Sequence, residues 1–305
     1  MTLDSWTALK GFSKPSRSTT LNAVRYEMGR QDERLRVSLG DNIAVWNGLE
    51  IWLGFQPRLI DGKPCVHRLD IEKNLDPIVN EAPWRPPANP VIVVDAGHGG
   101  PQVGTHSILA QRFEKEFALD WALRLERLLS SNGWTVFLTR TNDSDVAISN
   151  RVALAEKVKA DLFLSLHFNS SYPQTDQAGV ETYCLTPGGM PSSLTRGFED
   201  APDHTLPNNA FDGANLRYAW KIHRGILAST HGKDRGIRRA RFMGVLRPQS
   251  RAAVLVEGGY LSNPKEARLI AMPEYRQQLA VGIANALRLN SGATNAPPFQ
   301  AQAIP

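Results

Sequence analysis

Four ionisable residues stand at points of the sequence that favour a chemical role. His98 lies among glycines after the apolar run 91–94, and His167 and Glu257 each end a further apolar run, LFLSL and AAVLV. Glu114 lies in FEKE, where a helix is expected to begin. Two imidazoles and one carboxylate form a ligand set for a catalytic zinc ion, whose fourth position is left to water. An additional carboxylate could then serve as general base toward that water.

Each of these residues alone has a simpler interpretation. A single histidine at a strand end is usually a hydrogen-bonded structural residue, and a glutamate in a first helical turn is favoured by the helix dipole. Glu257 fits a structural role less well, because glutamate is rarely buried without a partner. The combination, rather than any one residue, therefore favours a metal site. His106, in the loop after His98, is the main competing ligand candidate.

The segment VIVVDAGHGG, residues 91–100, also has two other interpretations. A phosphate-binding loop is disfavoured, because the segment lacks Gly-Lys-Ser/Thr and the G-x-G-x-x-G spacing. A Ser-His-acid triad through Ser165 or Ser107 stays open, although the sequence has no G-x-S-x-G elbow.

Strands and helices alternate along residues 91–290, which predicts an α/β fold with helices on both faces of a sheet. The expected strands are 91–95, 134–138, 162–166, 179–185 and 252–257, and the expected helices are 117–128, 149–159, 214–230, one opening at 263–266, and 274–289. Ligands of open α/β sheets bind beyond the carboxyl ends of the strands. His98, His167 and Glu257 fall at such ends.

The remaining parts of the chain have a different composition. Short alternating strands and turn signals predict a small β-rich accessory domain before the α/β region, and a proline-rich segment predicts a semi-rigid linker between them. The expected organisation is a loose lead-in (1–20), the β-rich domain (21–78), the linker (79–90), the catalytic domain (91–290) and a disordered tail (291–305).

Composition excludes several classes of protein. The chain has 305 residues and a formal net charge of +5, with its basic residues spread along its length. No dense basic stripe or motif points to nucleic acid, no run approaches the length of a membrane span, and the N-terminus lacks the apolar core of a secretory signal. Cys65 and Cys184 are far apart, and we expect two buried free thiols rather than a disulfide.

Seven sequence blocks together are similar to one known family. Residues 91–289 resemble the zinc-dependent N-acetylmuramoyl-L-alanine amidases of the bacterial cell-wall amidase 3 family. The blocks are VVDAGHGG, FEKEFALDWALRLERLL, VFLTRTND, RVALAEKVKADLFLSLHFNSS, GVETY, GIRRARFMGVLR and AVLVEGGYLSNPKEARLI. The β-rich segment around GDNIAVWNGLEIWLGF is similar to the copper-amine-oxidase N-terminal-like domain, a name that implies no copper here.

The resemblance implies a mixed, mostly parallel six-stranded sheet and one Zn²⁺ per chain. His98, Glu114 and His167 match the family's zinc ligands, and Glu257 matches its catalytic glutamate. The implied reaction is hydrolysis of the amide between N-acetylmuramic acid and L-alanine in peptidoglycan, for wall remodelling, daughter-cell separation or recycling. Two alternatives stay open: a zinc peptidase that cuts within the stem peptide, and a catalytically silent wall-binding regulator.

Further residues are candidates for substrate contacts or regulation. Asn169, Arg140 and Arg151 could bind substrate, although structural salt bridges are the alternative for both arginines. In some relatives a segment like 186–213 carries an inhibitory acid, so Glu199 and Asp200 are candidates for that role; the alternative is a surface loop. The expected setting is the bacterial envelope, with peptidoglycan and a candidate regulatory activator as partners, no nucleic acid, no membrane span, and a monomeric state.

Overall fold

The computed structural model describes residues 1–20, 23–80, 87–109, 111–196 and 200–289. Within them, the α/β region contains six strands, and the predicted α/β class is confirmed. The strands are β8 (Val91–Ala96), β9 (Thr135–Leu138), β10 (Leu162–Asn169), β11 (Val180–Cys184), β12 (Asp234–Arg239) and β13 (Ala252–Tyr260). Strands β9, β8, β10 and β13 run parallel, and β11 is antiparallel to β13.

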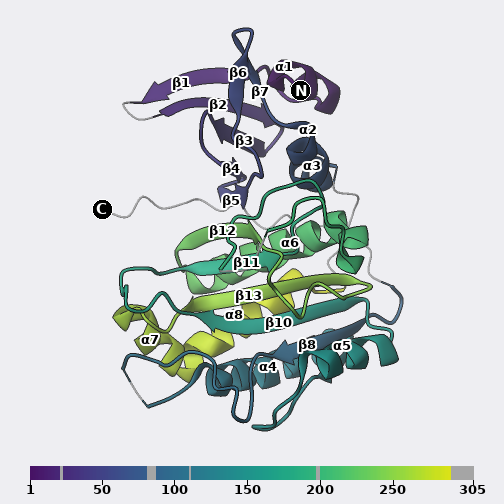
Figure 1. Cartoon of the computed structure of the whole chain (residues 1–305), viewed down its shortest axis with the longest axis vertical. Helices are drawn as coiled ribbons and strands as arrows, with labels where there is room; N and C mark the ends of the chain where they lie inside the picture. The colour runs from purple at the N-terminus through teal and green to yellow at the C-terminus, as the bar shows by residue number, and fades with distance from the viewer. Residues whose placement is uncertain (21–22, 81–86, 110, 197–199, 290–305) are drawn as a thin grey trace.

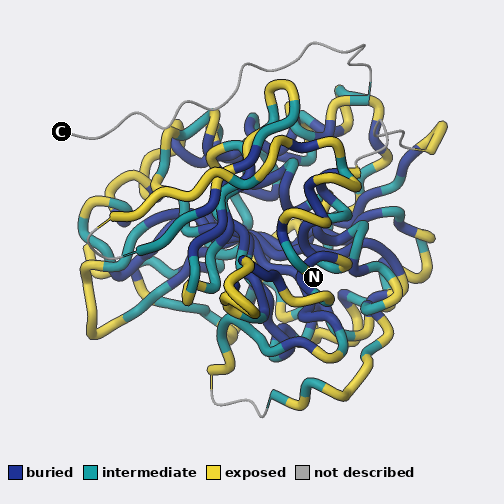
Figure 2. Tube along the Cα trace, turned by 90° about the horizontal axis from the view of Figure 1, so that it is seen from above, coloured by how far each residue is buried: buried dark blue, intermediate teal, exposed yellow. Residues whose placement is uncertain are grey.

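Helices cover both faces of this sheet, and each face has its own hydrophobic core. The helices are α4 (Glu114–Ser131), α5 (Ile148–Lys157), the 3-10 turn η2 (Pro207–Phe211), α6 (Asp212–Thr230), α7 (Pro264–Ala271) and α8 (Pro273–Ala286). The larger core joins one face of the sheet to α4, α6 and α8 through residues such as Trp121, Leu216 and Leu279. The smaller core joins the other face to α5 and residues 240–246. Figure 2 shows these buried segments in the interior, with exposed residues along the outer loops.

The N-terminal module, residues 1–80, is mainly an antiparallel meander of five strands. These are β1 (Ser16–Thr20), β2 (Ala23–Arg30), β3 (Glu33–Ser38), β4 (Ile43–Trp46) and β5 (Leu49–Trp52). A hairpin of β6 (Arg58–Ile60) and β7 (Lys63–Cys65) follows, and then the helical turns α2 (Arg68–Asp70), η1 (Ile71–Leu75) and α3 (Asp76–Val79).

This module extends the catalytic sheet. Strand β5 pairs in parallel with β12 through Ile51 and Ile237, so eleven of the described strands, all except β6 and β7, form one sheet from β1 at one end to β9 at the other (Figure 1). Arg239 is buried and donates to the carbonyl of Lys73 and the side chain of Asn74. Pairing covers the exposed backbone groups of the β12 edge. The module is therefore docked on the catalytic sheet, although residues 81–86 of the expected linker lie outside the described residues.

The prediction of a loose lead-in over residues 1–20 is wrong. Helix α1 (Leu3–Lys10) begins at the cap residue Thr2, whose hydroxyl accepts a hydrogen bond from the Ser5 amide. Trp6 is buried, and its indole nitrogen donates to Asp76 at 2.9 Å. This helix was not predicted because it is short and because its apolar residues form a recognisable buried face only in the folded module. The expected tail, 291–305, lies outside the described residues.

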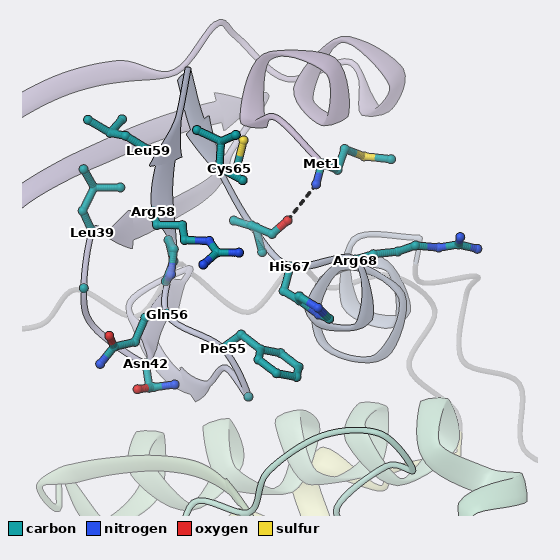
Figure 3. A pocket seen from close by; sticks show the side chains of 15 residues that line it. Met1, Leu39, Asn42, Phe55, Gln56, Arg58, Leu59, Cys65, His67 and Arg68 are labelled. Atoms are coloured by element: carbon teal, nitrogen blue, oxygen red, sulfur yellow. Dashed lines mark hydrogen bonds between the residues drawn. The ribbon is translucent and has the colours of Figure 1, made fainter. Parts of the chain in front are cut away.

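A cavity of about 1030 Å³ lies in the N-terminal module beside the β6–β7 hairpin. Figure 3 shows Phe55 and His67 close together at its edge, and their ring centroids are 3.8 Å apart. The amino group of Met1 donates to the carbonyl of Val66 in the same region. None of the site residues predicted from the sequence lines this cavity.

Two general expectations can be compared with the structure directly. Cys65 and Cys184 are both buried free thiols. Among the described helices, none has the length and apolar character that crossing a bilayer requires.

Candidate metal centre

His98, Glu114 and His167 come together at the carboxyl edge of the sheet. His98 follows β8 and His167 lies near the end of β10, and because these strands are parallel their carboxyl ends meet. Glu114 is the first residue of α4 and points back to the same edge. One ligand atom from each side chain lies within 4.8 Å of the other two. Side chains separated by up to 69 positions in the sequence thus form one cluster.

Glu114 stands between the two histidines. Its Oε1 lies 2.8 Å from His167 Nδ1 and accepts the Phe168 amide at 3.1 Å. Its Oε2 lies 3.1 Å from His98 Nε2 and accepts the Thr105 amide at 3.0 Å. Burial by itself raises the pKa of Glu114, but the hydrogen bonds to both imidazoles outweigh it and hold the pKa well below its usual range. The group is therefore an anionic carboxylate between two ring nitrogens.

Two glycines leave the room that this cluster needs. A Cβ on Gly97 would stand 2.3 Å from the His167 ring, and one on Gly104 would stand 2.5 Å from Glu114 Oε2. The φ of His98 is +62°, a left-handed backbone conformation that residues with a side chain rarely adopt outside sharp turns. The glycines around His98 therefore serve close packing and turning of the backbone, as only a residue without a Cβ can.

This donor set fits a zinc ion. Two imidazole nitrogens and a carboxylate oxygen lie within 4.8 Å of one another, and two histidines with one glutamate are a common protein ligand set of a catalytic zinc. His98 and His167 are partly exposed while Glu114 is buried, so the cluster is open to solvent on one side. An open position is what distinguishes a catalytic zinc site from a structural one.

Glu257 lies next to this cluster and differs from Glu114 in its surroundings. It is in register with His167 on the neighbouring strand β13, and only 6% of it is exposed. Among the described residues, its Oε2 is buried without a hydrogen-bond partner. Burial raises the pKa of Glu257 to about 8. A buried carboxylate with a free oxygen and a raised pKa suits a general base that must also give its proton back.

A cavity of about 540 Å³ opens beside His98 and His167. Much of its wall is apolar, formed by Val146, Ile148, Phe242, Met243 and Val245. The cluster therefore faces a cleft large enough for a substrate fragment.

Arg140 and Arg151 both donate hydrogen bonds to the loop that carries His98, and Arg151 is also among the residues that line the cleft. Arg140 donates to the carbonyls of Ala96, Gly97, Lys115 and Asn142. Arg151 donates to the Asp95 carboxylate and to the carbonyls of Ala96, His98 and Val146. Every side-chain nitrogen of both residues therefore has an acceptor within the protein. These contacts hold the loop that carries His98, which is the structural alternative expected for both arginines, and a substrate contact of either one stays a prediction.

Asp95 is the buried centre of this support. It accepts hydrogen bonds from Thr139 and Ser165, both at 2.7 Å, as well as from Arg151. Ser165 is fully buried and donates to Asp95, and the Ser107 hydroxyl accepts the Leu109 amide. Among the described residues neither serine forms a hydrogen bond with a histidine, so the geometry gives no support to a serine nucleophile.

Arg151→Met is expected to lower the free energy of unfolding by about 3–5 kcal/mol, because it leaves the buried Asp95 carboxylate without its cation. Urea denaturation of the wild type and the variant measures the effect. The double variant with Asp95→Asn should lose less than the sum of the two single losses, since the two side chains contact each other. Additive losses would contradict this coupling.

Asn169 belongs to a second polar network, on the other side of Glu257. Its Nδ2 donates to Glu181 at 2.9 Å and its Oδ1 accepts from Arg196 at 2.8 Å. Glu181 lies directly opposite Glu257 on strand β11 and also accepts from Tyr183 and Arg235. Sequence reasoning missed Glu181, although an acid within the apolar strand GVETY is the same signal that singled out Glu257.

Asp200 lies away from the metal cluster. Its carboxylate accepts from the Ser192 amide at 2.8 Å and pairs with the buried Arg241. Burial raises the pKa of Asp200, but hydrogen bonds from Ser192 and Arg241 outweigh it and lower the pKa. These contacts tie Asp200 to Ser192 and to Arg241, which favours the surface-loop alternative, and an inhibitory role of Asp200 stays a prediction. Glu199, the other candidate, lies outside the described residues.

Asp200→Ala tests this assignment. We expect no gain in activity, and a roughly 5- to 30-fold faster proteolytic cleavage within residues 186–213, equivalent to about 1–2 kcal/mol. Limited proteolysis followed by mass spectrometry measures the second effect. A clear rise in activity would instead restore the inhibitory role.

Comparison with known proteins identifies the family of residues 92–288, which match a family model described as N-acetylmuramoyl-L-alanine amidase. The chain is 28% identical over 218 residues to N-acetylmuramoyl-L-alanine amidase AmiA of Salmonella typhimurium, covering 65% of this chain and 74% of that protein.

Two solved structures have the same fold over the same share of the chain. The catalytic domain of CwlV, an N-acetylmuramoyl-L-alanine amidase from Bacillus (Paenibacillus) polymyxa, is 33% identical, with a TM-score of 0.52 over 65% of this chain and 95% of that chain. The CwlD amidase from Clostridioides difficile, solved in complex with the GerS lipoprotein, is 25% identical, with a TM-score of 0.52 over 66% of this chain and 100% of that chain. The family match covers well over half of the chain and includes the whole metal cluster. This chain therefore belongs to the N-acetylmuramoyl-L-alanine amidase family.

Proposed function

We propose that this protein uses His98, Glu114 and His167 to hold one zinc ion and Glu257 as general base, and that it cleaves the amide between N-acetylmuramic acid and L-alanine in peptidoglycan. The observation that carries the proposal is the cluster itself, three ligand atoms within 4.8 Å of one another, with a buried unpartnered carboxylate oxygen on the adjacent strand. Amide hydrolysis in peptidoglycan accords with membership of the family.

A zinc ion bound there would supply a Lewis acid that lowers the pKa of water and polarises the amide carbonyl. Glu257 Oε2 accepts a proton from the water that attacks the carbonyl carbon. The C–N bond then breaks, and the same proton passes from Glu257 to the departing nitrogen of L-alanine. Burial raises the pKa of Glu257, which favours return of the proton from its carboxyl group to the departing nitrogen.

The residues around the cluster keep it rigid. Arg140 and Arg151 hold the loop of His98 by its carbonyl groups, and backbone amides fix both oxygens of Glu114. Ligands held in this way need little rearrangement when a substrate binds.

The proposal is tested with purified protein and isolated peptidoglycan. We expect released stem peptides with a free N-terminal L-alanine, identified by mass spectrometry, and about one zinc per chain by elemental analysis. A chelator should abolish release, and added zinc should restore it. Cleavage between other residues of the stem peptide would favour the zinc peptidase alternative, and zinc binding without any cleavage would favour the silent regulator.

We further propose that the protein works in the bacterial envelope on peptidoglycan, as a monomer, and that an activator protein regulates it. The activator is suggested by the CwlD amidase that was solved with the GerS lipoprotein. Fractionation of the native cell and size-exclusion chromatography with light scattering test the location and the monomeric state. Co-purification of the intact chain from its native envelope tests the partner.

A further inference from the structure

A second, smaller cavity lies on the side of Glu257 away from the metal cluster. Its volume is about 260 Å³, and three arginines, Arg196, Arg235 and Arg238, are among its lining residues. The cavity beside His98 and His167 has an apolar wall, whereas this one is basic. The two cavities therefore flank Glu257 with different chemistry.

An irregularity in β12 brings two of the arginines to one face. In a regular strand, residues 235 and 238 would point to opposite faces of the sheet. The pairing of β12 with β11 shifts between Val180 and Thr182, and Gly236 has a φ of +85° there. An extra residue of this kind turns the side chains that follow it. Both guanidinium groups consequently line the same cavity.

The charge of Arg235 is already compensated within the protein. Its Nε donates to Glu181 at 2.8 Å and its Nη1 to Gln177 at 2.9 Å. Glu181 in turn accepts from Asn169 and Tyr183, so its two oxygens are fully engaged. The Arg235–Glu181 pair therefore adds no net charge to the wall of this cavity.

Arg238 makes no ion pair among the described residues, although the Glu50 carboxylate on the neighbouring strand β5 interacts with its charge at longer range. Its Nε donates to the carbonyl of Arg235 at 2.7 Å, and no ion pair or further hydrogen bond of its two terminal nitrogens is found there. Its guanidinium lies 5.3 Å from the ring centroid of Trp52, a residue of the N-terminal module. A cation held over an aromatic face keeps its edge free for an anion. The N-terminal module thus helps to orient Arg238.

Arg196 lines the smaller cavity and contacts a residue of the larger one. It donates to Asn169 and lies 5.6 Å from the ring of Phe242, which lines the metal-side cavity. With Arg238 it gives the second cavity a positive potential that the Arg235–Glu181 pair does not cancel.

We propose that Arg238, assisted by Arg196 and Arg235, binds a carboxylate of the stem peptide on the leaving side of the scissile amide. This inference rests on the proposed function. A peptidoglycan strand offers an uncharged sugar on one side of that amide and a peptide with carboxylates on the other. Arginine binds carboxylates through paired hydrogen bonds. The arginine that lines the other cavity, Arg151, already has an acceptor within the protein for each of its side-chain nitrogens. The basic cavity therefore sets the direction in which the substrate lies across Glu257.

The test uses two soluble muramyl peptides that differ only in the glutamate carboxylate next to L-alanine, free in one and amidated in the other. We expect the wild type to have a KM about tenfold lower for the free acid, the size of one charge-assisted pair. Arg238→Gln should bring the two KM values together, and Arg238→Lys should restore part of the difference. Arg127→Gln, an exposed arginine on α4 with the same change of charge, is the matched control and should retain the preference.

A binding measurement separates this inference from the proposed function. The peptide L-alanyl-D-glutamyl-diamino acid is titrated into wild type and Arg238→Gln by calorimetry, which requires no turnover. Tighter binding to the wild type supports the basic cavity even if neither muramyl peptide is cleaved, a result that would overturn the proposed function alone. Equal affinities, or an equal preference for the free acid in wild type and Arg238→Gln, would overturn the role of Arg238.

Discussion

Glu257→Gln is expected to lower kcat by about 10²- to 10⁴-fold, the range that a positioned general base contributes, while the zinc content stays unchanged. Glutamine keeps the shape of the side chain but cannot accept the proton of the attacking water. Glu257 is not one of the three clustered ligand residues, so metal binding should persist. Steady-state kinetics on a muramyl peptide and elemental analysis of the same sample measure the two quantities together.

A control variant and a second substitution of Glu257 test its assignment as general base. Glu126→Gln, on a partly exposed position of α4, makes the same chemical change away from the cluster and should leave kcat unaltered. Glu257→Ala should behave like Glu257→Gln, because both remove the base. Full turnover in either Glu257 variant would contradict the assignment of Glu257 as general base. Loss of zinc from these variants would instead indicate that Glu257 is a metal ligand.

His167→Ala is expected to empty the metal site and abolish activity together. Removing this ring takes away one of the three proposed ligands and also a hydrogen-bond partner of Glu114. A zinc site that has lost one of its protein ligands binds the ion too weakly to retain it during dialysis. Zinc per chain, measured after dialysis, should fall from about one to near zero.

His106→Ala is the control for this experiment. His106 lies in the same loop as His98, but its ring packs against Phe113 with centroids 4.3 Å apart, and it is not part of the three-residue cluster. The variant should keep its zinc and most of its activity. Loss of zinc from His106→Ala, with retention in His167→Ala, would show that the ligand set is wrong.

Much of the fold could be predicted because its signals are local. The runs at 91–95, 162–166 and 252–257 are apolar throughout, as strands buried on both faces must be, and they appear as β8, β10 and β13. Strand β12 was missed because DRGIRR has a single large apolar residue and a glycine in its middle. It forms a strand only because β11 and β5 pair with it on either side.

The contacts of the arginine side chains could not be predicted from the sequence. Arg140, Arg151 and Arg238 are the same residue type, and the sequence offers no means of telling whether a guanidinium is satisfied. The structure distinguishes them by their partners: carbonyl groups and Asp95 for the first two, and one backbone carbonyl and the face of Trp52 for the third. Those partners lie on other strands, loops and the N-terminal module.

The sequence by itself determined the alternation of strands and helices, the residue types that could hold zinc, and the carboxylate that stands apart from them. These follow from the spacing of apolar residues and from the chemistry of side chains at strand ends, both of which are local properties. Only the tertiary structure decided how closely His98 and His167 approach each other, that Glu114 hydrogen-bonds between their rings, and that the N-terminal module continues the sheet. Contacts of this kind depend on parallel strand register and on packing between distant segments, which no local pattern encodes.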